Sequence, residues 1–265
     1  QPVTGGSIDN EAGGTLVRAS GGTSTLSGLR IDGTLRVDPG SVVRCNGAGF
    51  NCPGTLAIND SASANDAYIV FRDNCTATGG GDIFLGGGGN DSQILTDAGS
   101  TLTLDPTFSI GGSGEVHATL VNNGLIHAYP SADGDGRLRL VGGTKTNHGV
   151  LAADTGGVLE INGTTIAQGP TGVVLADGGA VQFAGNATLS GGTIDAVNGG
   201  TVNKVSGGTL SLADSTIDGD FWLDTAGIVA LNGASLEVNG TFFVNNSGSA
   251  NDAYIRSDTN CTISG

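Results

Sequence analysis

The sequence predicts an all-β protein wound as a parallel β-helix, and three observations predict it. First, residues 1–79 and 187–265 are two copies of one stretch, which align without a gap and are identical at 35 of 79 positions. Second, short runs of alternating apolar and polar residues recur between Gly, Asn and Asp, a pattern typical of half-buried strands joined by turns. Third, no window carries the apolar stripe of an amphipathic helix.

This 186-residue repeat is the most specific of these observations. Residues 63–69 return unchanged as 249–255, and the triplet at 74–76 returns at 260–262. A stretch copied in register over this length indicates a segment of a tandem array. We therefore expect residues 1–265 to form a single continuous β-solenoid that belongs to a longer repeat protein, with 1–79 repeating as 187–265.

A shorter period runs inside the long one. Units of 18 to 25 residues begin at threonine, as in 101–118 and 144–164. They contain alternating runs such as 158–161, 193–197 and 201–205. If each unit forms one coil, strands of successive coils stack about 4.8 Å apart, and the glycine pairs between runs supply the positive φ of sharp corners. A β-sandwich is the competing architecture, but it does not require the long copy.

Composition limits the class of protein. Apolar residues make up 37% of the chain, so a core can form, and the 49 glycines lack the every-third period of collagen. The formal charge of −15 disfavours nucleic acid and anionic lipid as partners. No run of about 18 apolar residues occurs, so we expect no membrane insertion.

Glycine, asparagine, threonine and aliphatic residues recur in segments such as 119–127 (TLVNNGLIH), 157–163 (GVLEING) and 206–212 (SGGTLSL). In this recurring composition the chain resembles the β-helical solenoids of bacterial surface proteins, of the autotransporter passenger and filamentous-haemagglutinin type. The resemblance covers nearly the whole chain. It implies a right-handed parallel β-helix that is secreted or displayed at the cell surface.

Two cysteines of the first copy change together in the second. Cys45 and Cys52 correspond to Leu231 and Val238, which indicates two inward positions facing each other. We therefore expect a Cys45–Cys52 disulfide, and with it an oxidising compartment. A stacked bridge from Cys52 to Cys75, which follows it by about one coil, is an alternative, as are buried reduced thiols.

Aspartates recur at the spacing of one coil, in two pairs: Asp9 with Asp32, and Asp195 with Asp218. Each pair is expected to stack one strand apart, where two carboxylates contribute oxygen ligands to a calcium ion. Asp133 and Asp135, with glycine between them, form the loop that most resembles a calcium ligand set. The alternative is local turn chemistry, in which each Asp side chain bonds to nearby backbone. Calcium is the only cofactor that the sequence suggests.

Asparagine heads several Asn-x-Ser/Thr triplets, which are glycosylation acceptors in a secreted protein. The candidates are Asn74, Asn162, Asn186, Asn239 and Asn260. Unmodified turn asparagines are the alternative.

The only tryptophan, Trp222, falls where the first copy has Arg36. An exposed tryptophan can stack on a sugar, although a strand side chain that covers the solenoid is the simpler interpretation.

These patterns favour a structural or adhesive function over catalysis. A long repeat copied without gaps, together with no localised set of catalytic side chains, predicts a non-enzymatic surface stalk, sheath or filament component. The expected partners are further copies of the protein, by end-to-end or lateral self-association, and surface glycans or other cells. The alternative is a β-helix protein that binds or degrades polysaccharide.

Overall fold

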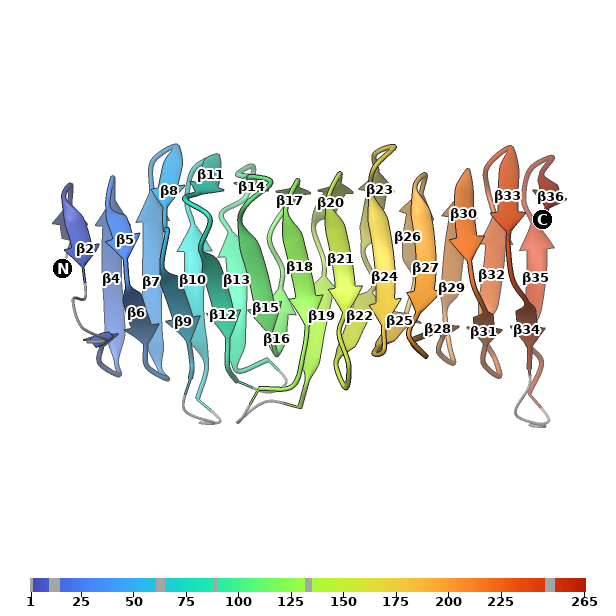
Figure 1. The fold of residues 1–265 in the computed structure, drawn as a ribbon, viewed down its shortest axis with the longest axis horizontal. Coiled ribbons are helices and arrows are strands. Elements are labelled where there is room, and N and C mark those ends of the chain that lie inside the picture. Colours follow the sequence, from blue (N-terminus) through green and yellow to red (C-terminus); the bar gives the residue numbers. More distant parts are fainter. Residues whose placement is uncertain (1, 10–14, 61–64, 88–89, 132–134, 246–250) are drawn as a thin grey trace. The chain divides into compact units, whose positions relative to one another are not determined.

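The computed structural model describes residues 2–9, 15–60, 65–87, 90–131, 135–245 and 251–265. These residues contain 36 β-strands and no α-helix. The chain divides into two compact units, unit 1 (1–139) and unit 2 (140–265). In each unit three strands make one turn of about 22 residues, and every third strand joins the same parallel sheet. The all-β parallel solenoid predicted from the sequence is therefore confirmed within each unit (Figure 1).

Unit 1 contains three sheets, named here in chain order. Its first sheet consists of β1 (Pro2–Thr4), β4 (Gly22–Ser27), β7 (Ser41–Asn46), β10 (Ala67–Phe71), β13 (Ser92–Thr96) and β16 (Gly114–Val116). Its second sheet consists of β2 (Ser7–Asp9), β5 (Arg30–Asp32), β8 (Gly49–Asn51), β11 (Cys75–Thr78), β14 (Leu102–Leu104) and β17 (Leu120–Asn122). Its third sheet consists of β3 (Thr15–Arg18), β6 (Thr34–Val37), β9 (Thr55–Ile58), β12 (Asp82–Leu85), β15 (Ser109–Gly112) and β18 (Leu125–Ala128).

Unit 2 repeats this arrangement, and β19 (Arg137–Val141) lies at the division between the units. Its first sheet consists of β22 (Val158–Asn162), β25 (Ala180–Ala184), β28 (Thr201–Lys204), β31 (Phe221–Leu223) and β34 (Phe242–Val244). Its second sheet consists of β20 (Thr144–Asn147), β23 (Thr165–Gln168), β26 (Ala187–Ser190), β29 (Thr209–Ala213), β32 (Ile228–Leu231) and β35 (Tyr254–Ser257). Its third sheet consists of β21 (Val150–Ala153), β24 (Val173–Asp177), β27 (Thr193–Val197), β30 (Ser215–Asp218), β33 (Ser235–Val238) and β36 (Thr262–Ser264).

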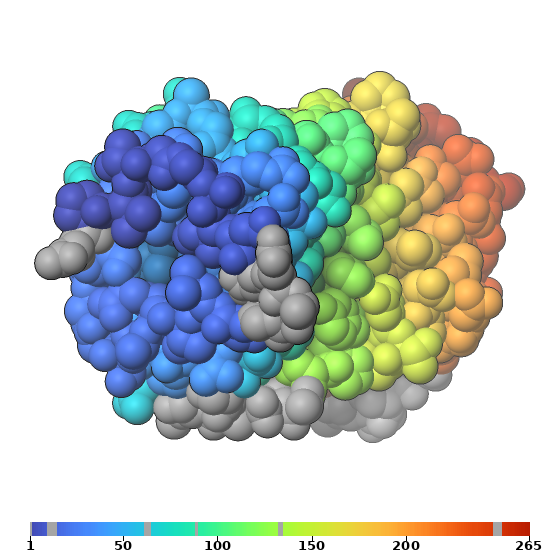
Figure 2. Space-filling model, turned by 60° about the vertical axis from the view of Figure 1, so that its left-hand side comes forward, coloured from blue at the N-terminus to red at the C-terminus, as the bar shows by residue number. Residues whose placement is uncertain are grey.

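Stacking of one coil on the next is what buries the core. Leu16, Leu35 and Leu56 are successive partners in the third sheet of unit 1, and their exposed fractions fall from 47% to 4% to 0%. Leu16 lies on the first coil, β1 to β3, which is dark blue in Figure 2. Each coil thus stabilises its neighbours by removing their apolar side chains from water, at about 25 cal/mol per Å².

Glycine is required where the corners of successive coils touch. In unit 1, a Cβ added to Gly54 would lie 2.0 Å from the carbonyl oxygen of Gly33, and one added to Gly81 would lie 2.0 Å from that of Gly54. The same glycines carry the inter-coil backbone bonds, since the amide of Thr55 donates to Gly33 and that of Asp82 to Gly54. Side chains at this corner would separate the coils, which explains part of the glycine content.

The long sequence repeat corresponds to a repeat of strands. Each strand of the first copy has its counterpart 25 strands later: β4 corresponds to β29, β7 to β32 and β10 to β35. Three strands make a turn within each unit, and 25 is not a multiple of three, so a strand and its counterpart hold different places in their turns: β4 belongs to the first sheet of unit 1 and β29 to the second sheet of unit 2. Corner geometry is copied too, because Asn59 and its counterpart Asn245 both have positive φ and both donate to a backbone oxygen six residues on. That the two units form one continuous solenoid remains a prediction.

Candidate functional site

The two aspartate pairs stack as the sequence predicted. Asp9 is the register partner of Asp32 in unit 1, and Asp195 is the partner of Asp218 in unit 2. Asp32 is also held in an ion pair by Arg30, with Nη2 and Oδ2 3.0 Å apart. A cation at the first pair therefore competes with a guanidinium, whereas Asp195 and Asp218 form no ion pair within the part of unit 2 that the structure describes.

Of the remaining calcium candidates, Asp135 gives turn chemistry. Asp135 accepts a hydrogen bond from the backbone amide of Arg137 at 3.0 Å, while Asp133 lies outside the described residues. Among the residues described, no group of three or more His, Cys, Asp or Glu side chains is arranged to hold a metal ion. Calcium binding thus remains a prediction, with Asp195 and Asp218 as its best-placed ligands.

The predicted Cys45–Cys52 disulfide is not present, because all four cysteines are free thiols. Cys45 lies on β7, whereas Cys52 follows β8 at a corner, where its thiol donates to the carbonyl of Gly54 at 3.3 Å. The alternative bridge to Cys75 is out of register, since Gly49 pairs with Thr76 and so Cys75 lies beside residue 48. Three of the thiols are buried.

Burial keeps these thiols protonated. It raises the pKa of Cys52 to about 12, with a smaller contribution from the Asp82 carboxylate, and that of Cys75 to about 11, with a contribution from Asp73. The pKa of Cys45 is raised further by burial and by the neighbouring Cys75 and Cys52. Thiolates are the reactive form, so the buried cysteines act as apolar core residues.

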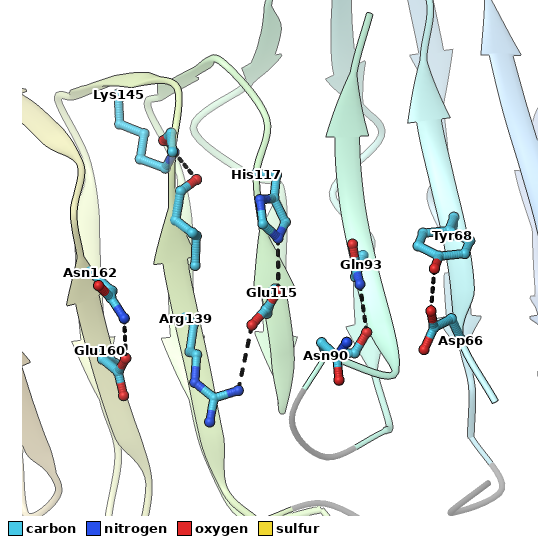
Figure 3. Close-up of polar contacts among 12 residues, drawn as sticks. Asp66, Tyr68, Asn90, Gln93, Glu115, His117, Arg139, Lys145, Glu160 and Asn162 are labelled. Atoms are coloured by element: carbon cyan, nitrogen blue, oxygen red, sulfur yellow. Dashed lines mark hydrogen bonds and ion pairs between the residues drawn. The ribbon is translucent and has the colours of Figure 1, made fainter. Parts of the chain in front are cut away.

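The candidate glycosylation asparagines have structural partners at the corners. Asn74 accepts a bond from the amide of Thr101, and Asn186 accepts one from that of Thr209, each on the following coil. Asn162 is half-buried and donates to Glu160 at 2.8 Å (Figure 3). Asn239 and Asn260 are exposed. The hydrogen bonds of Asn74 and Asn186 to the following coil explain why asparagine stands at these positions without glycosylation. Glycosylation remains a prediction.

Both lysines of the chain are buried in unit 2, which the sequence did not indicate. Lys145 is 2% exposed and Lys204 is 0% exposed. The Lys145 ammonium donates to the carbonyls of Val141, at 3.1 Å, and Gly142 (Figure 3). Burial lowers the pKa of Lys145 to about 8 and also lowers that of Lys204, where Asp224 opposes the effect. Both lysines satisfy corner carbonyls, and so have structural roles.

A charged cluster lies on the outer face of the first sheet of unit 1. Glu115 Oε2 is 2.7 Å from His117 Nε2, and Glu115 Oε1 is 3.5 Å from Arg139 Nη1 (Figure 3). The Glu115 side chain is 15% exposed. Two partners on one carboxylate favour a structural ion-pair cluster that links β16 to the start of β19.

A polar groove of about 270 Å³ lies on the third sheet of unit 1, and Asp82 is the one carboxylate among its described lining residues. Thr55 Oγ1 donates to Asp82 Oδ1 at 2.8 Å. Partial burial raises the pKa of Asp82, while the Thr55 hydrogen bond and His127 lower it. Hydrolysis of a glycosidic bond normally needs two carboxyl groups, so this groove is better suited to binding.

The rings of His127 and Tyr129 belong to the lining of the same groove, and the ring of Phe84 stacks on Tyr129. Phe84 and Tyr129 have centroids 6.2 Å apart, and His127 and Tyr129 have centroids 4.7 Å apart. Gly111 is the register partner of both Phe84 and His127, and a Cβ added to it would lie 2.6 Å from the Tyr129 ring. The missing side chain is what allows these rings to lie over the strand.

A second hollow, of about 280 Å³, lies on the first sheet of unit 2; it is called the Trp222 hollow below. Its lining residues are Gln182, Thr201, Asn203, Trp222 and Asp224. The indole of Trp222 stacks on the ring of Phe243, with centroids 4.0 Å apart and planes 11° from parallel.

Sequence reasoning singled out Trp222 but missed its neighbours and the whole Asp82 groove. These side chains are brought together by register: Gln182 pairs with Asn203, Asn203 with Trp222, and Trp222 with Phe243. Coil lengths vary, so an average period does not reveal which outward residues become neighbours.

The described residues include no helix long and apolar enough to cross a membrane. The fold and these surfaces together define a parallel β-solenoid repeat protein with polar and aromatic hollows on its outer faces. Comparison with protein-family models, curated proteins and solved structures finds no significant match.

Proposed function

We propose that this chain is an extracellular structural or adhesive β-solenoid, a component of a surface stalk, sheath or filament, without catalytic activity. One observation carries the proposal: the long copy preserves strand positions and the corner bond of Asn59 and Asn245, although only 35 of its 79 positions are identical. Selection for a repeated backbone fits a protein whose length and regularity are its function.

The proposal includes a secreted or cell-surface location, as in the autotransporter and filamentous-haemagglutinin type of solenoid that the sequence resembles. It also includes self-association, end to end or laterally, because the backbone of a coil can pair with a coil of another copy as well as with its own neighbour. Surface glycans and other cells are the proposed targets of adhesion.

The experiment is negative-stain imaging of the native protein from its source, combined with immunolabelling of intact cells. We expect thin fibres and label outside the cell. Compact particles, or label confined to the cell interior, would overturn the proposal.

Polysaccharide binding is a second candidate, favoured by the two hollows that combine aromatic rings with polar side chains. It is compatible with an adhesive shaft, which needs ligand sites on its outer faces.

A further inference from the structure

We propose that the Trp222 hollow binds one ring of a neutral glycan; this inference rests on the adhesive function proposed above and adds a ligand class to it. The platform is rigid, because Phe243 covers one face of the indole at a centroid distance of 4.0 Å. A rigid aromatic face is a large apolar contact surface with little conformational entropy to lose on binding.

The other face of the indole borders the hollow. Asn203 is the register partner on that side, and its Nδ2 donates to Asp224 Oδ2 at 3.2 Å, two residues beyond Trp222 on the next coil. The Asn203 amide is thus held by Asp224, and the hollow of about 280 Å³ lies among the indole and these polar side chains. This volume is close to the lower end of small-ligand sites, roughly 300 Å³.

The rim of the hollow supplies directional bonds. Gln182 and Asn203 contribute amides, Thr201 a hydroxyl and Asp224 a carboxylate, so donors and acceptors surround a flat apolar face. A pyranose ring has the matching chemistry, with C–H groups on its face and hydroxyl groups at its edge. The Asp224 carboxylate and the net charge of −15 disfavour acidic sugars, so a neutral sugar fits this site better than an acidic one.

The first copy shows that this hollow is not required by the scaffold. The counterparts of Asn203, Trp222 and Phe243 are Val17, Arg36 and Ala57, which are register partners in the same order.

Asp224 corresponds to Asp38, which is paired with Arg36 at 3.0 Å. Replacing this arginine by Trp222 adds an aromatic face and at the same time removes the guanidinium that pairs with the carboxylate in the first copy. The inward neighbour is buried in both copies, as Leu35 in the first and Phe221 in the second. The three differences at these register positions together replace an ion pair with a stacked platform and a hydrogen-bonding rim.

Trp222 is the only tryptophan, so emission excited selectively from tryptophan, and not from the three tyrosines, reports this site alone. The experiment titrates the chain with neutral oligosaccharides of glucose, mannose, galactose and N-acetylglucosamine. We expect a saturable change in emission with at least one series. The double variant Gln182→Ala with Asn203→Ala, which retains the fluorophore, should weaken binding by about tenfold or more, equivalent to about 1.4 kcal/mol. Gln93→Ala, an outward residue in unit 1, is the matched control and should bind as the wild type does.

Trp222→Arg restores the residue of the first copy and should fold, since Arg36 occupies that position in an intact strand. Calorimetry should show that sugar binding is lost while the circular dichroism spectrum is unchanged. The inference is overturned if no neutral series gives saturation, if the double variant binds as the wild type does, or if choline but no sugar saturates the emission change. Fibres without sugar binding would overturn this inference alone, whereas compact intracellular particles would overturn the proposed function.

Discussion

Phe221 tests whether stability in this protein accrues coil by coil. The side chain is fully buried on β31, and its ring lies 6.2 Å from that of Phe183 and 4.7 Å from that of Phe242, centroid to centroid. Its register partners are Val202 on the preceding coil and Phe242 on the following one. Removing the ring therefore leaves a cavity that two neighbouring coils share.

The expected cost of Phe221→Ala is about 3–5 kcal/mol, the range for truncating a buried phenylalanine. In a solenoid each coil contacts only its neighbours, so the loss should appear as local opening of the coils that contain β28, β31 and β34. At about 1.4 kcal/mol per factor of ten, protection against hydrogen exchange should fall there by two to three orders of magnitude or more.

The assay is hydrogen exchange followed by mass spectrometry, with unit 1 as the internal reference. Phe221→Leu is the matched control, because leucine stands at the corresponding position 35 of the first copy and is 4% exposed there. Its cost should be smaller, on the order of 1–2 kcal/mol, since part of the ring volume is kept. Equal loss of protection in β7 and β10, far along the chain, would refute coil-by-coil stability, as would equal effects of the two variants.

Three further predictions concern titratable groups and metal. Burial lowers the pKa of Lys145 from 10.5 to about 8, so between these pH values the unfolded chain binds more protons than the folded one. The free energy of unfolding should therefore rise with pH across that window, by up to about 3 kcal/mol. Denaturation curves of Lys145→Met should lack this rise, and identical pH profiles of variant and wild type would contradict the prediction. Iodoacetamide at pH 8 should modify Cys261 first, since it alone among the cysteines is not buried. Peptide mapping that finds the other three thiols modified equally fast would contradict their burial. Calcium bound between Asp195 and Asp218 should raise the thermal midpoint through its preference for the folded state, and Asp218→Asn should abolish the rise; a midpoint that millimolar calcium does not move excludes the site.

Local patterns were sufficient to identify strands and their inward faces. The alternating run at 158–161 is β22, that at 193–197 is β27, and that at 201–205 contains β28. Alternation is a property of the strand itself, because successive side chains point to opposite faces. Trp222 was considered as a sugar-stacking aromatic because the long copy places it where Arg36 stands, and the long copy itself indicated a repeat of stacked coils.

Register, by contrast, is a tertiary property. Asp9 and Asp32 are register partners, whereas Cys52 and Cys75, which have the same separation in sequence, are not. The coil between the cysteines is longer, since Asn51 pairs with Thr78 and not with Asn74, as the shorter spacing would require. The lengths of the corner loops decide how many residues separate register partners on successive coils. Because these lengths differ, an average sequence spacing does not give the register of a particular pair.

The sequence by itself determined the strand periodicity, the winding of short strands into stacked coils and the long repeat, because each follows from local alternation, turn residues and self-similarity. Only the tertiary structure decided which outward side chains share a hollow, as Asn203 does with Trp222 and Asp82 with Thr55. Such neighbours lie on different coils, and their meeting depends on how many residues each intervening corner uses.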